Sequence, residues 1–160
     1  MDNVSKARWL ALLVPAGLLG GAYVAQYGFG LPPCEMCWWQ RYPHFAAVGL
    51  AAMAFFLRPA AVWTAVAGLA ILTSGLIGGF HAGVEYGWWQ GITGCSTIPS
   101  AVDVMDLRAA PLIRCDRAPW SLFGISLAGW NFLISGLAGA TILVLCAYRG
   151  RGRQPALRST

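Results

Sequence analysis

The stretch Ala60–Phe80, AAVWTAVAGLAILTSGLIGGF, contains no charged residue. A helix needs about 20 apolar residues to cross the ~30 Å hydrocarbon core of a bilayer, so this stretch qualifies as a membrane span. Residues 9–27 and 122–147 are two further uncharged runs of sufficient length. A shorter run, 43–57, ends at Arg58-Pro59 and leads directly into the full-length span. The sequence therefore predicts an all-α fold, a four-helix transmembrane bundle.

The composition supports a single membrane domain over residues 1–160. Of these residues 58% are apolar and only 11% are charged, against roughly a quarter charged in a soluble domain. The four spans leave a short first loop, 28–42, a long second loop, 81–121, and a tail, 148–160. We expect the two loops to carry the chemistry. Within the long loop, Val102–Leu107 is predicted to form a short amphipathic helix on the bilayer surface.

The placement of charged residues orients the predicted bundle. With four spans, both termini and the Arg58 turn lie on one side of the membrane. That side holds seven basic residues and one acid, whereas the other side holds four basic residues and five acids. The positive-inside rule then places both termini in the cytoplasm and both loops outside it. The net charge of +5 follows from this topology and indicates no nucleic-acid partner. Run 9–27 is longer than a signal-peptide core and lacks a clear cleavage site, so we expect an uncleaved span.

Four of the five cysteines fall on the extracytoplasmic side. Cys34 and Cys37 lie in the short loop, and Cys95 and Cys115 lie in the long one. Disulfides persist outside the cytoplasm, so two pairs on that side fit an oxidising compartment. A long loop with a disulfide can carry it from a partner to a fixed site. Cys146, near the cytoplasmic end of the last span, is expected to be a small packed apolar residue.

The C-x-x-C pair lies beside a fixed cation and a hydrocarbon phase. This combination indicates electron transfer between protein thiols and a lipid-soluble acceptor. If the second helix starts near Glu35, Cys37 lies in its first turn, where the helix dipole favours a thiolate. Arg41 then lies on the same face one turn deeper. Pro43 leaves two alternatives: a kinked helix from Glu35, or a helix that begins only near Gln40.

Other residue patterns have structural explanations. We expect the small-residue pairs Gly17/Gly21, Gly75/Gly79 and Gly136/Ala140 to let helices approach closely. Asn131 and Ser135 are predicted to form hydrogen bonds between helices and not to bind substrate. Six aromatic residues are assigned to an interfacial belt: Trp38, Trp39, Tyr42, Trp88, Trp89 and Trp120.

A zinc site is an alternative use of four cysteines. Structural zinc sites commonly use two closely spaced pairs, and Cys95 and Cys115 are too far apart in sequence to form one. C-type haem attachment fails because Trp38, and not histidine, follows Cys37. We therefore expect no metal.

Three motifs together carry a family resemblance. The segment 33–41, PCEMCWWQR, the segment 81–85, HAGVE, and Cys115-Asp116 followed by 119–124, PWSLFG, resemble the disulfide bond formation protein B (DsbB) family. The resemblance extends over essentially the whole chain. It implies a thiol:quinone oxidoreductase of the bacterial inner membrane, with periplasmic redox loops.

The resemblance also implies the residue roles. A reduced periplasmic thioredoxin-fold oxidase (DsbA-like) would attack a Cys95–Cys115 disulfide at Cys95. Freed Cys115 would then attack Cys34 of a Cys34–Cys37 disulfide and release Cys37. Cys37 would pass the electron pair to a quinone, either ubiquinone or menaquinone, from the membrane pool. The quinone-binding residues would be Arg41, His81 and Cys37.

Three rival interpretations stay open. Glu35 puts an acid beside Cys34, which leaves room for a specialised paralogue with one dedicated partner. A vitamin K epoxide reductase type of enzyme fits less well, since C-x-x-C lies in the first loop here. A non-catalytic membrane protein with structural disulfides or zinc belongs to a different class. Redox lability separates the last rival from an enzyme, because structural disulfides resist mild reductant.

Overall fold

The computed structural model describes residues 2–95 and 113–151, with side chains up to residue 148. Over these residues the chain is mostly helical. Its elements are α1 (Asn3–Tyr23), the π-helical turn η1 (Val24–Gly28), α2 (Glu35–Phe56), α3 (Ala60–Glu85), the short strands β1 (Ser121–Leu122) and β2 (Ile125–Ser126), and α4 (Leu127–Arg151). The predicted helix at Val102–Leu107 lies outside the described residues.

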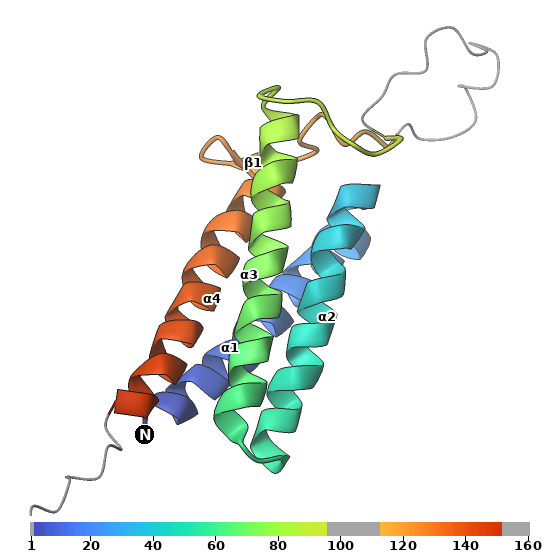
Figure 1. Ribbon diagram of the computed structural model, residues 1–160. Helices are drawn as coiled ribbons and strands as arrows, with labels where there is room; N and C mark the ends of the chain where they lie inside the picture. The colour runs from blue at the N-terminus through green and yellow to red at the C-terminus, as the bar shows by residue number, and fades with distance from the viewer. Residues whose placement is uncertain (1, 96–112, 152–160) are drawn as a thin grey trace, which may run out of the picture.

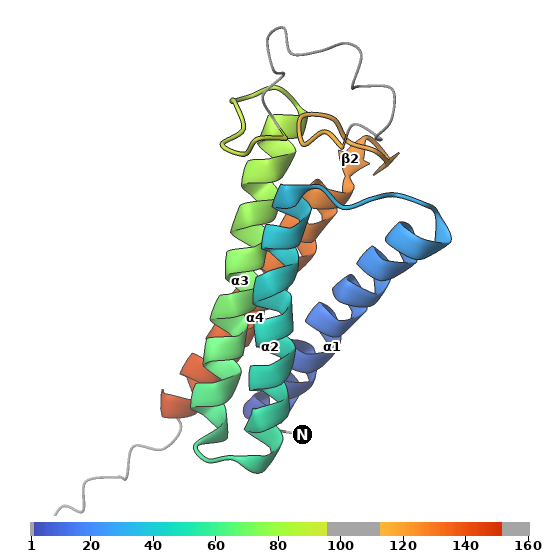
Figure 2. The ribbon, with the colours of Figure 1, turned by 90° about the vertical axis from the view of Figure 1, so that its right-hand side faces the viewer.

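The helices form one bundle in which α2, α3 and α4 run alongside one another and α1 crosses them obliquely (Figures 1 and 2). The start of α1, the α2–α3 turn and the end of α4 lie at one end of the bundle. The segment before α2, the segment after α3 and the β1–β2 hairpin lie at the other end. All four cysteines of the two loops are therefore brought to the same end of the molecule.

Helix α2 is longer than the apolar run that predicted it. It begins at Glu35 and passes through Pro43 as one helix, so a start near Gln40 is wrong. The cap explains the early start, because Cys34 Sγ accepts a hydrogen bond from the Cys37 backbone N–H at 3.3 Å. Likewise α3 continues to Glu85, so His81 lies in a helix and not in the loop.

Close packing of α3 against α4 depends on glycines from both helices. A Cβ on Gly75 would lie 2.9 Å from the backbone nitrogen of Gly136, and a Cβ on Gly139 would lie 3.0 Å from the Gly68 carbonyl. The predicted close approach is thus present between α3 and α4 at Gly75 and Gly136, and Gly68 and Gly139, which were not predicted, add a second such contact. Gly17 and Gly21 differ: a Cβ there meets nothing within 4 Å, and both residues line a cavity instead.

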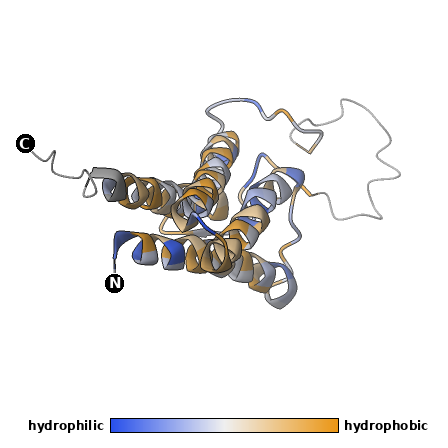
Figure 3. Cartoon of the chain, turned by 60° about the horizontal axis from the view of Figure 1, so that its bottom comes forward, coloured by the Kyte–Doolittle hydropathy of each residue, from blue (hydrophilic) through white to orange (hydrophobic). Residues whose placement is uncertain are grey.

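The outer surface of the bundle is apolar, as membrane insertion requires. Leu76 on α3 is 61% exposed and Leu137 on α4 is 73% exposed, although both lie mid-helix. Hydrophobic residues run along the helices, and the first turns of α1 are among the most hydrophilic parts (Figure 3). Within residues 2–95 and 113–151, three helical segments are long and apolar enough to cross a membrane: Asn3–Gly28, Ala60–Glu85 and Leu127–Tyr148.

A tight hairpin closes the bundle beside α3. Phe123 and Gly124, between β1 and β2, have φ values of 53° and 76°, as a two-residue type I′ hairpin turn requires. Tyr86, at the end of α3, fixes this hairpin: its hydroxyl donates to the Gly124 carbonyl and accepts from the Ser126 N–H, both at 3.1 Å. The start of α4 is thereby attached to the end of α3.

Candidate active site

The first cysteine pair, Cys34 and Cys37, is built on the N-terminus of α2. The two residues are thiols whose Sγ atoms lie 2.9 Å apart, with Cys34 buried and Cys37 half-buried. Donation of the Cys34 S–H to Cys37 raises the pKa of Cys34, and burial adds to the effect. The hydrogen bond from the Cys37 backbone N–H lowers the pKa of Cys34, but this effect is weaker. Negative charge in this pair is therefore best placed on Cys37.

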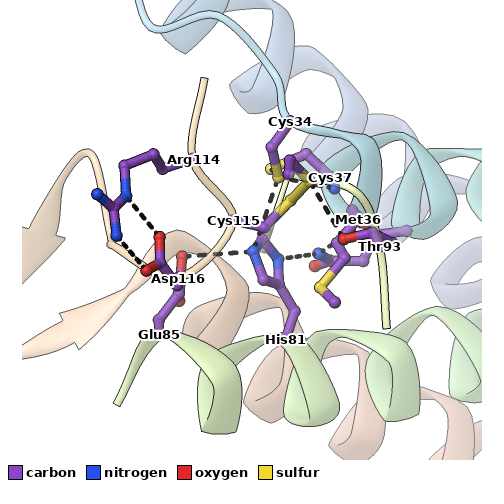
Figure 4. The surroundings of a disulfide bond; sticks show 11 residues. Cys34, Met36, Cys37, His81, Glu85, Thr93, Arg114, Cys115 and Asp116 are labelled. Atoms are coloured by element: carbon purple, nitrogen blue, oxygen red, sulfur yellow. Dashed lines mark hydrogen bonds and ion pairs between the residues drawn. A yellow bond between two sulfur atoms is a disulfide. The ribbon is translucent and has the colours of Figure 1, made fainter. Parts of the chain in front are cut away.

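The second pair is a disulfide between Cys95 and Cys115, which are 20 positions apart in the sequence. Its two sulfurs differ in access: Cys115 is fully buried, whereas Cys95 is half-buried beside the Thr93 hydroxyl, 3.2 Å from its sulfur. All four cysteines pack in one cluster with Met36 and Val84, and Figure 4 shows Cys115 beside the first pair.

His81 lies beneath the first pair and is 2% exposed. Its Nε2 is 3.7 Å from Cys34 Sγ and 3.7 Å from Glu85 Oε1, so the ring sits between a sulfur and a carboxylate (Figure 4). Its Nδ1 is 2.9 Å from Gln40 Nε2. The second oxygen of Glu85, Oε2, is buried without a hydrogen-bond partner. A buried acceptor of this kind favours a ligand or proton that would satisfy it.

Arg41 is 6% exposed and held from two sides. It donates from Nη1 to Gln26 Oε1 at 2.6 Å and from Nη2 to the Ala22 carbonyl at 3.3 Å. The guanidinium also lies 5.0 Å from the ring centres of Tyr23 and Trp38. No carboxylate is among these contacts, so the positive charge of the buried guanidinium is available to interact with a ligand.

A cavity of about 260 Å³ joins these groups. Its polar walls include Cys37, Gln40, Arg41, His81, Glu85 and Asn131, and mostly apolar residues of α1, of the segment before α2 and of the start of α4 form the rest. Its volume is just below the usual range of small-molecule sites, about 300–1,000 Å³. Its few polar groups in an apolar lining suit one ring that has hydrogen-bond acceptors.

Among the residues that the structure describes, one group could hold a metal ion. The ligand atoms of Cys34, Cys37 and His81 lie within 4.8 Å of one another. Cys95 and Cys115 are bonded to each other in this structure, and cysteines in a disulfide cannot act as thiolate ligands.

Several residues of the site have no role in the sequence-based prediction. Gln26 and Glu85 contact the predicted residues Arg41 and His81, and His44 lines the same cavity. Polar residues within an apolar run are functional candidates by default, and that signal was present for Gln26 and His44. Asn131 does form the predicted inter-helix hydrogen bonds, to Gln40 and Ser74.

The comparison with known families agrees with this arrangement. The family model for disulfide bond formation protein DsbB matches residues 5–145, nearly the whole chain. The chain belongs to the DsbB family. The resemblance predicted from sequence is thereby confirmed, and this DsbB-family chain is a membrane protein of disulfide bond formation.

Relatives from several bacteria are similar over most of their length. The chain is 32% identical over 154 residues to disulfide bond formation protein B of Verminephrobacter eiseniae, covering 89% of this chain and 85% of that one. It is 32% identical to disulfide bond formation protein B 2 of Pseudomonas syringae, with 81% of each covered. An uncharacterized protein of Rickettsia prowazekii is 27% identical, with 73% of each covered. No solved structure matches the chain.

Proposed function

We propose that this protein is a thiol:quinone oxidoreductase that reoxidises a periplasmic, DsbA-like thioredoxin-fold partner and delivers the electrons to a membrane quinone. The single observation that carries the proposal is the position of Cys37. Its thiol belongs to the cluster of four cysteines and also opens onto the cavity with Arg41 and His81. Thiol exchange and electron delivery thus share one sulfur.

The first exchange begins at Cys95. Cys115 is fully buried and Cys95 is half-buried, so an incoming thiolate is expected to attack the Cys95 sulfur. The partner's thiolate forms a bond to Cys95, the Cys95–Cys115 bond breaks, and Cys115 leaves as a thiolate. The partner's second thiol, as a thiolate, then attacks the partner's own sulfur in the mixed disulfide. Cys95 is released, and the partner leaves with an oxidised disulfide. Two electrons now reside on the second pair.

The electrons then pass to the first pair. Cys115 packs in the same cluster as Cys34, so its thiolate attacks Cys34 when the first pair is oxidised. The Cys34–Cys115 bond forms, the Cys34–Cys37 bond breaks, and Cys37 leaves as a thiolate at the helix N-terminus. Attack of Cys95 on Cys115 restores the second disulfide and frees Cys34. The products of this exchange are a bonded second pair and two thiols in the first.

The cavity supports the last step. A bound quinone would supply a two-electron, two-proton acceptor, and reoxidation of the Cys34 and Cys37 thiols to a disulfide supplies both electrons and both protons. Arg41, which has no carboxylate partner among its hydrogen bonds, would donate to a ring oxygen and stabilise negative charge there. Cys37 lines the same cavity and needs no conformational change of α2 to face the ring.

The proposal includes the topology. We place α1, α2, α3 and α4 across the bacterial inner membrane, with both termini in the cytoplasm and both cysteine pairs in the periplasm. The positive-inside distribution supports this orientation. Helix α2 is not among the three segments that are long and apolar enough to cross a membrane, and its packing against α1 and α3 supports it as a span.

The test is quinone reduction by the purified protein with a reduced thioredoxin-fold oxidase as electron donor. Wild-type protein should turn over with ubiquinone or menaquinone, and Cys37→Ala should not. Cys146→Ala is the control, since this residue lies at the other end of the bundle. Absence of turnover with both quinones, together with cysteines that do not exchange with mild reductant, would favour the structural alternative.

A further inference from the structure

Asn131 on α4 has an amide whose orientation is fixed by a backbone carbonyl. Its Nδ2 lies 3.2 Å from the Ser74 carbonyl, which can only accept a hydrogen bond, so Nδ2 must be the atom at that position. Its Oδ1 accepts from the Ser135 hydroxyl at 2.7 Å. With this orientation, Nδ2 also donates to Gln40 Oε1 at 2.9 Å.

Gln40 on α2 is fixed in the same way from its other end. Its Nε2 donates to the Met36 carbonyl at 3.2 Å, and its Oε1 accepts from Asn131. Turning both amides over would place Oε1 against the Met36 carbonyl and Asn131 Oδ1 against the Ser74 carbonyl. Each contact would be between two acceptors, and buried acceptors without donors are costly. The two carbonyls therefore orient both amides consistently.

This orientation decides where His81 carries its proton. Gln40 Nε2 faces His81 Nδ1 at 2.9 Å, so Nδ1 must present its lone pair. A neutral imidazole with an unprotonated Nδ1 has its proton on Nε2. That atom faces Cys34 Sγ and Glu85 Oε1, both of which can accept. We propose that Asn131 and Gln40 are positioning residues that hold His81 as a neutral ring with its proton on Nε2.

The held proton gives His81 a defined role at the site. A second proton on Nδ1 would face the Gln40 amide hydrogens, and loss of the Nε2 proton would leave an imidazolate. His81 is therefore a fixed hydrogen-bond donor toward the cavity and Cys34, and does not carry protons. The same proton blocks the lone pair that a metal ion would need, although Cys34 and Cys37 lie close by. This role rests on the proposed function; the tautomer itself does not.

The test is the ring ¹⁵N NMR spectrum of histidine-labelled protein, reduced at the first pair and without quinone or partner. The chain has only two histidines, so a His81→Gln spectrum leaves the signals of His44 and assigns both rings. We expect an unprotonated Nδ1 and a protonated Nε2 for His81. A protonated Nδ1, or a doubly protonated ring near neutral pH, would overturn the proposal. The wild-type spectrum decides this even if a variant does not fold.

Two variants and a control test the positioning residues. Gln40→Met removes the donor to Nδ1, and Asn131→Val removes the group that orients Gln40. In each we expect the ratio of the two His81 tautomers to shift by about fivefold, the factor for one hydrogen bond. Ser135→Ala removes a hydrogen bond from the same buried network but keeps the Ser74 anchor, so the His81 signals should not move. Unchanged signals in Gln40→Met would contradict the proposal.

The result separates this inference from the proposed function. If His81 has the expected tautomer but the protein reduces no quinone, the hydrogen-bond chain is supported and the proposed function is contradicted. If the protein reduces quinone but His81 has a different tautomer, the proposed function is supported and this inference is contradicted. With both intact, Gln40→Met should lower the rate of quinone reduction by about fivefold and leave thiol exchange at Cys95 unchanged.

Discussion

The two cysteine pairs differ in how the chain holds them. The first pair lies at the N-terminus of α2, where the cap, His81 and a buried polar network fix it. The second pair joins two segments that have no helix or strand at either cysteine, and Cys95 is less buried than Cys115. A partner protein needs an accessible sulfur, whereas a small acceptor needs a fixed one. The difference in support thus matches the two exchanges proposed for the pairs.

The largest effects should come from removing one sulfur of each pair in turn. We expect Cys37→Ala to lower quinone reduction by roughly 10³-fold or more while Cys95 still forms a mixed disulfide with the partner. Cys95→Ala should abolish that mixed disulfide yet retain quinone reduction driven by a small dithiol. Gel trapping of the mixed disulfide and quinone absorbance measure the two activities. If both variants lose both activities, the pairs do not act separately.

The next effect concerns the fixed cation beside the first pair. Arg41→Gln should raise the KM for quinone by roughly 10- to 100-fold, the value of one charge-assisted hydrogen bond. Arg8→Gln is a matched control, because Arg8 also donates to a backbone carbonyl and lies over an aromatic ring, Phe55, at the opposite end of the bundle. Steady-state kinetics in detergent would measure the KM of each variant. An unchanged KM in Arg41→Gln would mean that Arg41 does not bind the quinone.

A smaller effect is expected from the packing that supports the first pair. A Cβ on Gly78 would lie 2.9 Å from the Ala128 carbonyl and 3.0 Å from Asn131 Nδ2. We expect Gly78→Ala to push α3 from α4 and to reduce the free energy of unfolding by about 1–3 kcal/mol. Gly49→Ala is the control, since a Cβ there meets nothing within 4 Å. Equal stability of the two variants, measured by denaturation in detergent, would contradict the tight contact.

The smallest effect belongs to the second pair. Arg114 donates from Nε to Asp116 Oδ1 at 2.8 Å and also binds the second oxygen, and this pairing lowers the pKa of Asp116. A lowered carboxyl pKa stabilises the fold above the ordinary pKa of aspartate, and this stabilisation is lost as pH falls through the lowered value.

Arg114→Gln should therefore speed reduction of the Cys95–Cys115 disulfide slightly at neutral pH. At pH values low enough to protonate Asp116 the variant and wild type should converge. Because the pair is partly exposed, the neutral-pH difference should be small and should shrink in high salt. A difference that grows toward low pH would have the wrong sign.

The helices could be predicted from the sequence because they depend on local patterns, since uncharged runs indicate membrane-spanning helices. The candidate site residues were named from a local motif, C-x-x-C followed by Arg41, and their roles stay predictions. The start of α2 was harder, because Cys34 caps it through a side-chain contact that hydropathy does not encode. The chain of hydrogen bonds from Asn131 to His81 joins residues 91 and 41 positions apart, so no local pattern reveals it.

The unequal burial of Cys95 and Cys115 bears on the route of electron flow. In the proposed relay, solvent-borne thiols of every kind meet the same sulfur, and Cys115 is always the group released inward. Access therefore sets the order of the exchanges and excludes the route in which a partner thiol meets Cys115 first. It changes forward and reverse rates alike, so net flow toward the membrane is driven by the acceptor, which must draw electrons from the first pair for a strongly oxidising partner to be reoxidised.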